Sequence, residues 1–192
     1  MFSNQKKRSR GKHALVIMEK GGKMMQRVPF LFNAEKNLSI LSSAAFLTTH
    51  DQNKTNVMVT AWGSLGYMWK LPVLVAMVRK SRYTYSFLTK TREFTASIPY
   101  MDMAREIEIC GHQSGRKLDK IAACGFNLRH GEKIATPVLD IPGMHFECKI
   151  IYNRLMSAER LDPAINELWY DHAQGNYHAF FIAQVVDSYL LP

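Results

Sequence analysis

Short apolar runs separated by polar turns recur along most of the chain, a pattern typical of β-strands. The runs at 45–49 and 57–62 are rich in β-branched and aromatic residues, and the polar segment 51–54 between them indicates a turn, so together they predict a hairpin. Residues 72–78 are continuously apolar, which favours a strand buried on both faces. Further strands are expected at 94–98, 144–152 and 180–186.

Two helix starts are also predicted. Ser81 is expected to cap a helix that continues through 87–88, and Ser114 is expected to cap a second helix. Gly125 would end the second helix, because glycine readily adopts the left-handed conformation found at helix ends. No internal repeat interrupts these patterns. The expected fold is therefore mainly β with α insertions, a β-barrel with helices inserted between its strands.

Length and composition favour one globular domain. The chain has 192 residues, of which 47% are hydrophobic and 21% charged, as in soluble globular proteins. No apolar run approaches the roughly 18 residues that a membrane span needs, and the basic N-terminus lacks the apolar segment of a secretion signal. We therefore expect a cytoplasmic protein that does not enter a membrane.

The net charge of +9 is concentrated at the N-terminus. Residues 1–23 hold seven Lys or Arg and one acidic residue, so the other 169 residues carry only +3. We expect residues 1–29 to form a basic extension and residues 30–192 to form the domain. The extension is a possible nucleic-acid binder, but it lacks the interleaved aromatics of a surface that stacks bases. Its Lys-Gly-Gly run resembles a translated ribosome-binding site, which predicts that translation starts at Met24 or Met25.

The three cysteines point to packing rather than chemistry. Cys110, Cys124 and Cys148 are odd in number and include no Cys-x-x-Cys pair, so neither a disulfide framework nor a zinc site is indicated. Free cysteine commonly packs as a small hydrophobic residue. Buried thiols are therefore expected, and no metal site is predicted.

Three stretches, 56–62, 79–85 and 114–120, combine hydroxyls, cations and aromatic side chains. Along the first, strand alternation gathers one polar and aromatic face from Asn56, Met58, Thr60 and Trp62. Such a face suits a flat ring that needs a wall together with donors and acceptors. An ordinary half-buried strand would also show this pattern.

The second and third stretches favour a phosphate. Each is predicted at the start of a helix, where free backbone N–H groups and the helix dipole attract anions. Hydroxyls and cations are supplied there by Arg79, Lys80, Ser81, Arg82 and Thr84, and by Ser114, Arg116 and Lys120. Taken singly, each stretch is equally compatible with helix capping and solvent-exposed charge.

The order and combination of the motifs resemble the flavin reductase-like, FMN-binding split-barrel proteins, which include flavoredoxins. The resemblance covers roughly 38–190 and is carried by the motifs at 56–62, 79–84, 93–99, 110–120, 137–139 and 147–149. It implies a split β-barrel that forms a homodimer and binds FMN tightly near the dimer interface. The FMN contacts that it implies are Asn56, Val57, Thr60, Ala61, Trp62, Arg79, Lys80, Ser81, Arg82, Thr84, Ser114 and Lys120.

The function implied by this resemblance is electron transfer through bound FMN, from reduced nicotinamide, NAD(P)H, to a flavin, a ferric chelate or a redox protein. The flavin carries such chemistry, so no catalytic nucleophile or general base is expected. No Gly-x-Gly-x-x-Gly fingerprint marks a separate dinucleotide-binding domain. Two alternatives remain: a flavoredoxin-type electron carrier with little NAD(P)H turnover, and a nucleic-acid binder that uses the basic extension.

Histidines lie near two of the motifs without forming a recognisable catalytic set. His112 and Gln113 occupy positions where the family usually has small or hydroxyl residues, which leaves the second substrate open. His172 and His178 precede the last predicted strand, where a histidine could approach the flavin of a partner subunit. Structural or solvent-exposed roles are expected for them, since no third metal ligand converges with them in the sequence.

Overall fold

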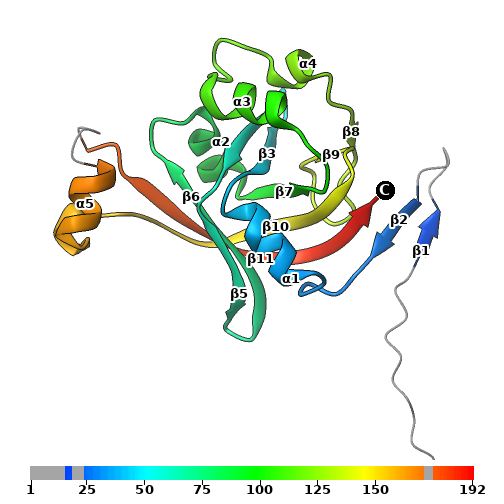
Figure 1. Ribbon diagram of the computed structural model, residues 1–192, viewed down its shortest axis with the longest axis horizontal. Coiled ribbons are helices and arrows are strands. Elements are labelled where there is room, and N and C mark those ends of the chain that lie inside the picture. Colours follow the sequence, from blue (N-terminus) through cyan, green and yellow to red (C-terminus); the bar gives the residue numbers. More distant parts are fainter. Residues whose placement is uncertain (1–15, 19–23, 171–174) are drawn as a thin grey trace, which may run out of the picture.

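Nine strands of the described chain form one antiparallel sheet that curls into an open barrel (Figure 1). The computed structural model describes residues 16–18, 24–170 and 175–192. Strand order is β1-β2-β11-β10-β7-β3-β4, and β6 pairs with β11 and with β5. The strands are β1 (Val16–Met18), β2 (Met24–Arg27), β3 (Ala45–Asp51), β4 (Lys54–Thr60), β5 (Gly63–Met68), β6 (Leu71–Arg79), β7 (Glu93–Pro99), β10 (Gly143–Leu155) and β11 (His178–Leu191).

The helices are inserted between the strands, as the sequence predicts. They are α1 (Ala34–Leu41), α2 (Tyr83–Thr91), α3 (Ala104–His112), α4 (Lys120–Cys124) and α5 (Pro163–Tyr170), with a 3-10 turn at Ala158–Arg160. A small second sheet joins β8 (Leu128–Arg129) to β9 (Val138–Leu139). The mainly β fold with α insertions is thereby confirmed.

Strand alternation explains where the core lies. On β10, Met144, Phe146 and Cys148 belong to the main cluster inside the barrel, whereas His145 and Glu147 face the opposite side. Burying an aromatic or aliphatic side chain stabilises the fold by roughly 1.5–3 kcal/mol relative to exposing it. The barrel core thus rests on the period-two pattern that the sequence displays.

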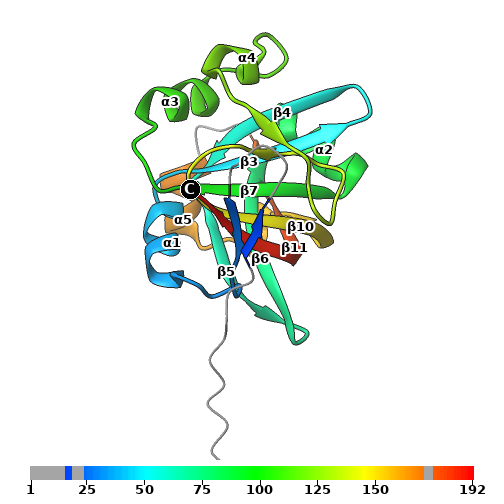
Figure 2. The same cartoon turned by 90° about the vertical axis from the view of Figure 1, so that its right-hand side faces the viewer.

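A second apolar cluster attaches α3 and α4 to the outer face of the β3–β4 hairpin (Figure 2). Phe46 and Val57 supply the hairpin side, and Cys110 and Phe126 pack against them from the helical segment. The hairpin itself is confirmed, with Ala45 opposite Thr60 and Asp51 opposite Lys54. This packing holds the loop that connects α3 to α4 beside the end of β4.

Both predicted serine caps are wrong. Arg82 occupies the cap position of α2 without a side-chain bond, and the Ser81 hydroxyl instead accepts a hydrogen bond from the Asn176 amide at 2.8 Å. Helix α4 begins at Lys120, well after Ser114, because the Asp119 carboxylate accepts hydrogen bonds from the N–H groups of Ile121 and Ala122. The predicted helix end at Gly125 is confirmed by its left-handed φ of 65°.

The sheet includes part of the predicted extension. Strand β2 pairs with β11 through Arg27 opposite Tyr189 and Gln26 opposite Leu190, and Met25 is buried. Residues 1–15 and 19–23, with the basic cluster, lie outside the described residues, so the predicted start at Met24 or Met25 and the nucleic-acid alternative stay predictions. Within the described residues, no helix is both long and apolar enough to cross a bilayer.

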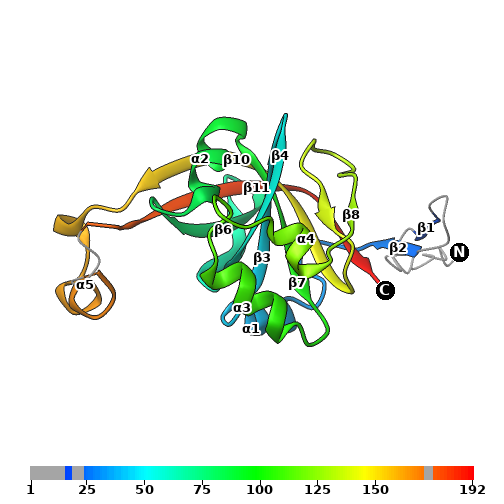
Figure 3. The same ribbon diagram turned by 90° about the horizontal axis from the view of Figure 1, so that it is seen from above.

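Strands β10 and β11 continue past the barrel as a two-stranded arm that carries α5 (Figure 3). Two register shifts, between Glu147 and Cys148 and between Ile150 and Tyr152, bend this pair. The arm brings α5 back toward the end of β4, where Trp169 meets Trp62. A segment far along the sequence thereby reaches the neighbourhood of the first of the three stretches.

Candidate functional site

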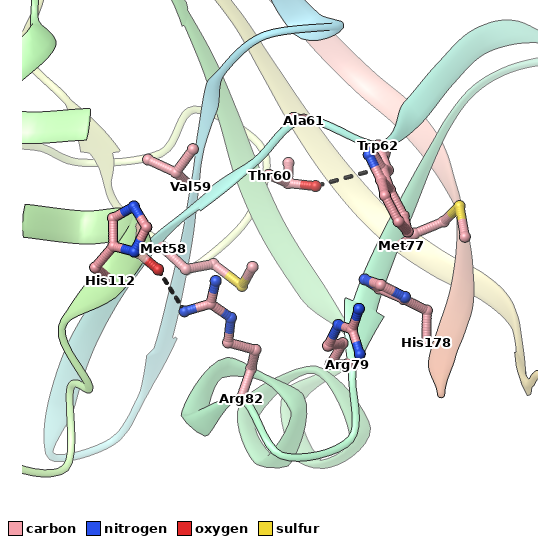
Figure 4. A pocket seen from close by; sticks show the side chains of 11 residues that line it. Met58, Val59, Thr60, Ala61, Trp62, Met77, Arg79, Arg82, His112 and His178 are labelled. Atoms are coloured by element: carbon pink, nitrogen blue, oxygen red, sulfur yellow. Dashed lines mark hydrogen bonds between the residues drawn. The ribbon is translucent and has the colours of Figure 1, made fainter. Parts of the chain in front are cut away.

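A cavity of about 230 Å³ lies between the end of β4, the end of β6, the start of β11 and the last turn of α3 (Figure 4). Its walls come from Met58, Val59, Thr60, Ala61, Trp62, Met77, Arg79, Arg82, Gly111, His112 and His178. A smaller cavity of about 60 Å³ adjoins it and shares Met58, Arg82 and His112 with it. The smaller cavity is completed by Asn56, Tyr83, Thr84, Gln113, Ser114, Gly115 and Lys120.

The three stretches meet at the smaller cavity. The buried Asn56 amide donates a hydrogen bond of 2.7 Å to the Thr84 hydroxyl, which ties β4 to α2. Gly115 packs so closely on Asn56 that a Cβ there would lie 1.9 Å from the Asn56 Oδ1 atom. Glycine is therefore required at this position for steric reasons, and the loop after α3 can press onto the strand.

Two cations, the half-buried Arg82 and the buried Lys120, face this region without an acidic partner among the described residues. Arg82 donates to the Gly111 carbonyl at 2.6 Å, and Lys120, which is 5% exposed, donates to the Cys110 carbonyl at 3.2 Å. Neither forms an ion pair within the described residues. A buried charge without a counter-charge is costly, so these two cations form a site that favours an anion.

Electrostatics of the cations agree with this geometry. Burial lowers the pKa of Lys120, and repulsion from Arg82 adds to the decrease. Burial likewise lowers the pKa of Arg82, with a further contribution from Arg79. Lys120 and Arg82 are therefore each destabilised in their charged form by burial and by a neighbouring cation.

The larger cavity has an aromatic wall. The indole of Trp62 meets Trp169 edge to face at a centroid distance of 4.9 Å and lies 4.7 Å from the imidazole of His178. The Trp62 carbonyl accepts from the Met77 N–H at 3.1 Å, which fixes the wall to β6. Flat side chains with nearby backbone polar groups suit a planar heteroaromatic ligand.

His178 lies in the cavity wall of its own subunit, whereas the sequence favoured a structural or solvent-exposed role and raised an approach to the flavin only of a partner subunit. Its Nδ1 atom is 2.7 Å from the Tyr170 hydroxyl. Burial lowers its pKa to about 4, and Arg79 and Arg82 contribute to the decrease. His178 is therefore neutral near pH 7, while His172 lies outside the described residues.

Nine of the twelve predicted contact residues line one or both cavities: Asn56, Thr60, Ala61, Trp62, Arg79, Arg82, Thr84, Ser114 and Lys120. The other three lie elsewhere. The Val57 side chain is fully buried in the second apolar cluster, Lys80 is exposed, and Ser81 is exposed beside Asn176. Lys120 is the first residue of α4 rather than a residue within a longer helix.

Several lining residues were not predicted. Met77 precedes Arg79 by two positions on β6, so strand alternation could have identified it. Gly111 and Tyr83 carry no chemical signal that separates them from ordinary structural residues. Among the described residues, no cluster of three His, Cys, Asp or Glu side chains is arranged to bind a metal.

Structural comparison finds a similar fold in solved proteins. A flavoredoxin from Methanosarcina acetivorans has a TM-score of 0.59 and 23% identity, over 77% of this chain and 67% of that one. An NADH:FAD oxidoreductase from Streptomyces globisporus C-1027 has a TM-score of 0.56 and 16% identity, over 76% and 73%. These likenesses show a shared fold.

Sequence comparison gives the family. An uncharacterized protein from Archaeoglobus fulgidus is 24% identical over 106 residues, which are 55% of this chain and 59% of that relative, so the match spans less than two thirds of the relative. The model of the flavin reductase like domain matches residues 39–191, nearly all of the barrel and both cavities. The chain therefore belongs to the flavin reductase-like family.

Proposed function

We propose that the two cavities together bind FMN and that the protein is an FMN-dependent oxidoreductase, which passes electrons from reduced nicotinamide to a flavin, a ferric chelate or a redox protein. The observation that carries the proposal is a pair of cations, the half-buried Arg82 and the buried Lys120, which have no acidic partner among the described residues and lie at one end of an aromatic-walled cavity. A phosphate would satisfy both cations, and a flavin ring would cover the wall formed by Trp62.

The residues present fit such a ligand. Thr84 and Ser114 add hydroxyls at the cationic end, and Thr60 adds one at the ring end. When bound, the flavin would supply the acceptor and donor of electrons or hydride. The protein's own residues would anchor the phosphate, orient the ring and exclude water, so the site needs no nucleophile.

We further propose a homodimer. The larger cavity is smaller than the roughly 300–1,000 Å³ typical of ligand pockets, so a second subunit would complete its walls. Large apolar side chains are exposed at the β5–β6 turn and on the arm, at Tyr67, Trp69, Tyr152 and Leu155. Light scattering on the purified protein tests this, and a monomer at micromolar concentration would contradict it. A cytoplasmic location is proposed with it.

An electron-carrier function is the second candidate, and exposed residues beside the cavity favour it. Leu168 is 70% exposed and Trp169 47% exposed on α5, next to Trp62, where a redox protein could dock. Stopped-flow assays of NADH and NADPH oxidation, with free flavin or ferric chelate as acceptor, separate the two functions. Absence of turnover with either donor, in protein that holds FMN, would favour the carrier over the reductase.

The visible spectrum of the purified protein tests the core of the proposal. We expect flavin absorbance and the release of FMN on denaturation. A colourless protein that also fails to bind added FMN would overturn the proposal. The readout does not depend on knowing the electron donor.

The phosphate assignment has its own test. Arg82→Ala should weaken the binding of FMN by about 30-fold and that of riboflavin far less, because a charge-assisted hydrogen bond contributes about 2 kcal/mol and only FMN has the phosphate. Lys117→Ala is the control, since Lys117 is exposed and lines neither cavity. Equal weakening of both flavins, measured by fluorescence titration, would contradict the assignment.

A further inference from the structure

We propose that Tyr170 is a positioning residue that holds the neutral imidazole of His178 with its hydrogen on Nε2, so that this N–H is presented to the cavity as a donor. Its acceptor would be a ring nitrogen or ring carbonyl of the bound ligand. The ligand part of the inference rests on the proposed flavin function, whereas the state of His178 does not.

Tyr170 is itself held rigidly. It ends α5, is 3% exposed and stacks on Tyr177 at a centroid distance of 4.8 Å with an interplanar angle of 19°. The guanidinium of Arg79 lies over its ring, 5.2 Å from the centroid, and donates hydrogen bonds to the carbonyls of Trp169 and Asn176. The Tyr170 hydroxyl therefore has a fixed position relative to β11.

The direction of the hydrogen bond follows from the competing acceptors. The Tyr170 hydroxyl has one hydrogen to donate, and two acceptors lie near it: His178 Nδ1 at 2.7 Å and Met156 Sδ at 3.6 Å. An imidazole nitrogen is a much stronger acceptor than a thioether sulfur. Tyr170 therefore donates to Nδ1, and in the neutral ring the hydrogen must then reside on Nε2.

The surroundings keep the ring neutral. The charged groups that face it are Arg79 from β6 and Arg82 from the start of α2, and the neighbouring Tyr170 and Tyr177 are uncharged. No acidic side chain of the described residues forms an ion pair with His178. Two nearby positive charges and partial burial oppose protonation, in line with the lowered pKa.

The Nε2 atom is the part of the ring that is left to bind something. His178 lines the cavity, and no hydrogen bond to Nε2 is formed by the described residues. Figure 4 shows the ring directed from β11 into the space between Trp62 and Arg79. Because both the donor and its support are already in place, little ordering is needed when a ligand binds.

Such a donor would favour the electron-rich form of the ligand. Reduction increases the negative charge on the ring's acceptor atoms, so a fixed N–H stabilises the reduced ring more than the oxidised ring. His178 would transfer no proton in this role. The consequence is tighter binding of reduced than of oxidised FMN, relative to a variant in which the tautomer is free to change.

Nitrogen NMR of the imidazole in ligand-free protein tests the first part. We expect the wild type to show one neutral tautomer with hydrogen on Nε2, and Tyr170→Phe to show a mixture of both tautomers. Tyr177→Phe is the matched control, because the Tyr177 hydroxyl contacts Asn166 rather than His178. A wild-type His178 that shows both tautomers, is positively charged near pH 7, or carries its hydrogen on Nδ1 would overturn the inference. This result does not depend on whether Tyr170→Phe folds.

Redox-dependent binding tests the second part. In Tyr170→Phe, the ratio of the dissociation constants of oxidised and reduced FMN should fall by about 2- to 10-fold, as expected for one weakened hydrogen bond, and Tyr177→Phe should leave it unchanged. FMN that binds all variants with the wild-type ratio would overturn the ligand part. Failure of every variant and the wild type to bind FMN would instead overturn the proposed function.

Discussion

Buried charge is handled in opposite ways at two regions of the barrel. On the outward face of β10, the carboxylate of the fully buried Glu147 accepts hydrogen bonds from the N–H groups of Glu132 and Lys133, both at 2.7 Å, and from the Tyr189 hydroxyl at 2.8 Å. At the cavity, Lys120 is also buried, but the Cys110 carbonyl is its only hydrogen-bond partner among the described residues.

This difference separates a structural charge from a charge that we propose binds a phosphate. Glu147 is satisfied by its own chain, so it fixes the loop at 131–136 against the sheet. Lys120 and Arg82 each donate to one backbone carbonyl but have no counter-charge among the described residues, which is destabilising unless an anion binds. Both regions contain motifs that carry the family resemblance, so the degree of internal pairing, rather than the motif itself, distinguishes the proposed binding site.

The largest effect is expected at Glu147, whose carboxylate is fully hydrogen-bonded. Glu147→Ala should lower the free energy of unfolding by about 4 kcal/mol, because two backbone donors and a hydroxyl lose a charged acceptor inside the protein. Chemical denaturation of the FMN-free protein measures this loss. The exposed Glu167 is the control, and Glu167→Ala should change stability by less than about 0.5 kcal/mol. A small effect of Glu147→Ala would show that Glu147 is not a structural charge and would contradict its contrast with Lys120.

The next effect is a pH dependence of stability. Burial lowers the pKa of His145 to about 4 from its ordinary 6.5, so between these values the unfolded chain binds a proton that the native protein does not. The contribution of His145 to the free energy of unfolding is therefore fully present above about pH 6.5. It falls by about 3 kcal/mol as the pH decreases from 6.5 to 4.

The variant His145→Gln isolates this contribution. It should flatten the stability profile between pH 4 and 6.5, measured by denaturation at several pH values, although it is less stable at pH 7 because Ser97 and the Ile141 carbonyl lose the ring. An unchanged slope would show that other groups cause the acid sensitivity.

At the cavity end, one substitution should have effects of opposite sign. Lys120→Met should raise the stability of the FMN-free protein by about 1 kcal/mol, since an unpaired buried cation is removed, and should weaken FMN binding by about 30-fold. Thermal melts and fluorescence titration give the two values. Lys117→Met serves as the exposed control. A loss of stability together with unchanged affinity would assign Lys120 to the structural class of Glu147.

The smallest effect concerns shape rather than charge. Gly115→Ala should weaken FMN binding by about tenfold, because the added Cβ displaces the Asn56 side chain from its bond to Thr84. Gly66→Ala is the matched control, since a Cβ at Gly66 meets nothing within 4 Å. Equal affinities of the two variants, measured by the same titration, would show that the contact of Gly115 with Asn56 does not shape the smaller cavity.

Periodic patterns along the chain were sufficient to predict the barrel. The hairpin of β3 and β4 and the long strand β10 follow from alternation and turn residues, which are local properties. Cap positions were harder, because a sequence window contains competing caps. Asp119 caps α4 with two hydrogen bonds, which leaves Ser114 in the loop before it.

The contacts around the site depend on residues far apart in the chain. Ser81 bonds to Asn176, 95 residues away, and α5 brings Tyr170 to His178 by way of the arm. No spacing rule reports such pairs, since they depend on how β10 and β11 bend. The predicted cationic residues and Trp62 were found by their chemistry, whereas the contacts of Trp169 and His178 with Trp62 required the three-dimensional structure.

The first residue of β11, His178, lies in the cavity wall, and α5 at the end of the arm brings Trp169 against Trp62. The cationic end is built by β4, α2 and the loop before α4, none of which belongs to the arm. Under the proposed function, changes in the sequence of α5 would alter which molecule meets the ring while the anchor for the phosphate stays the same. In evolutionary terms, such a chain would separate retention of the cofactor from the choice of its reaction partner.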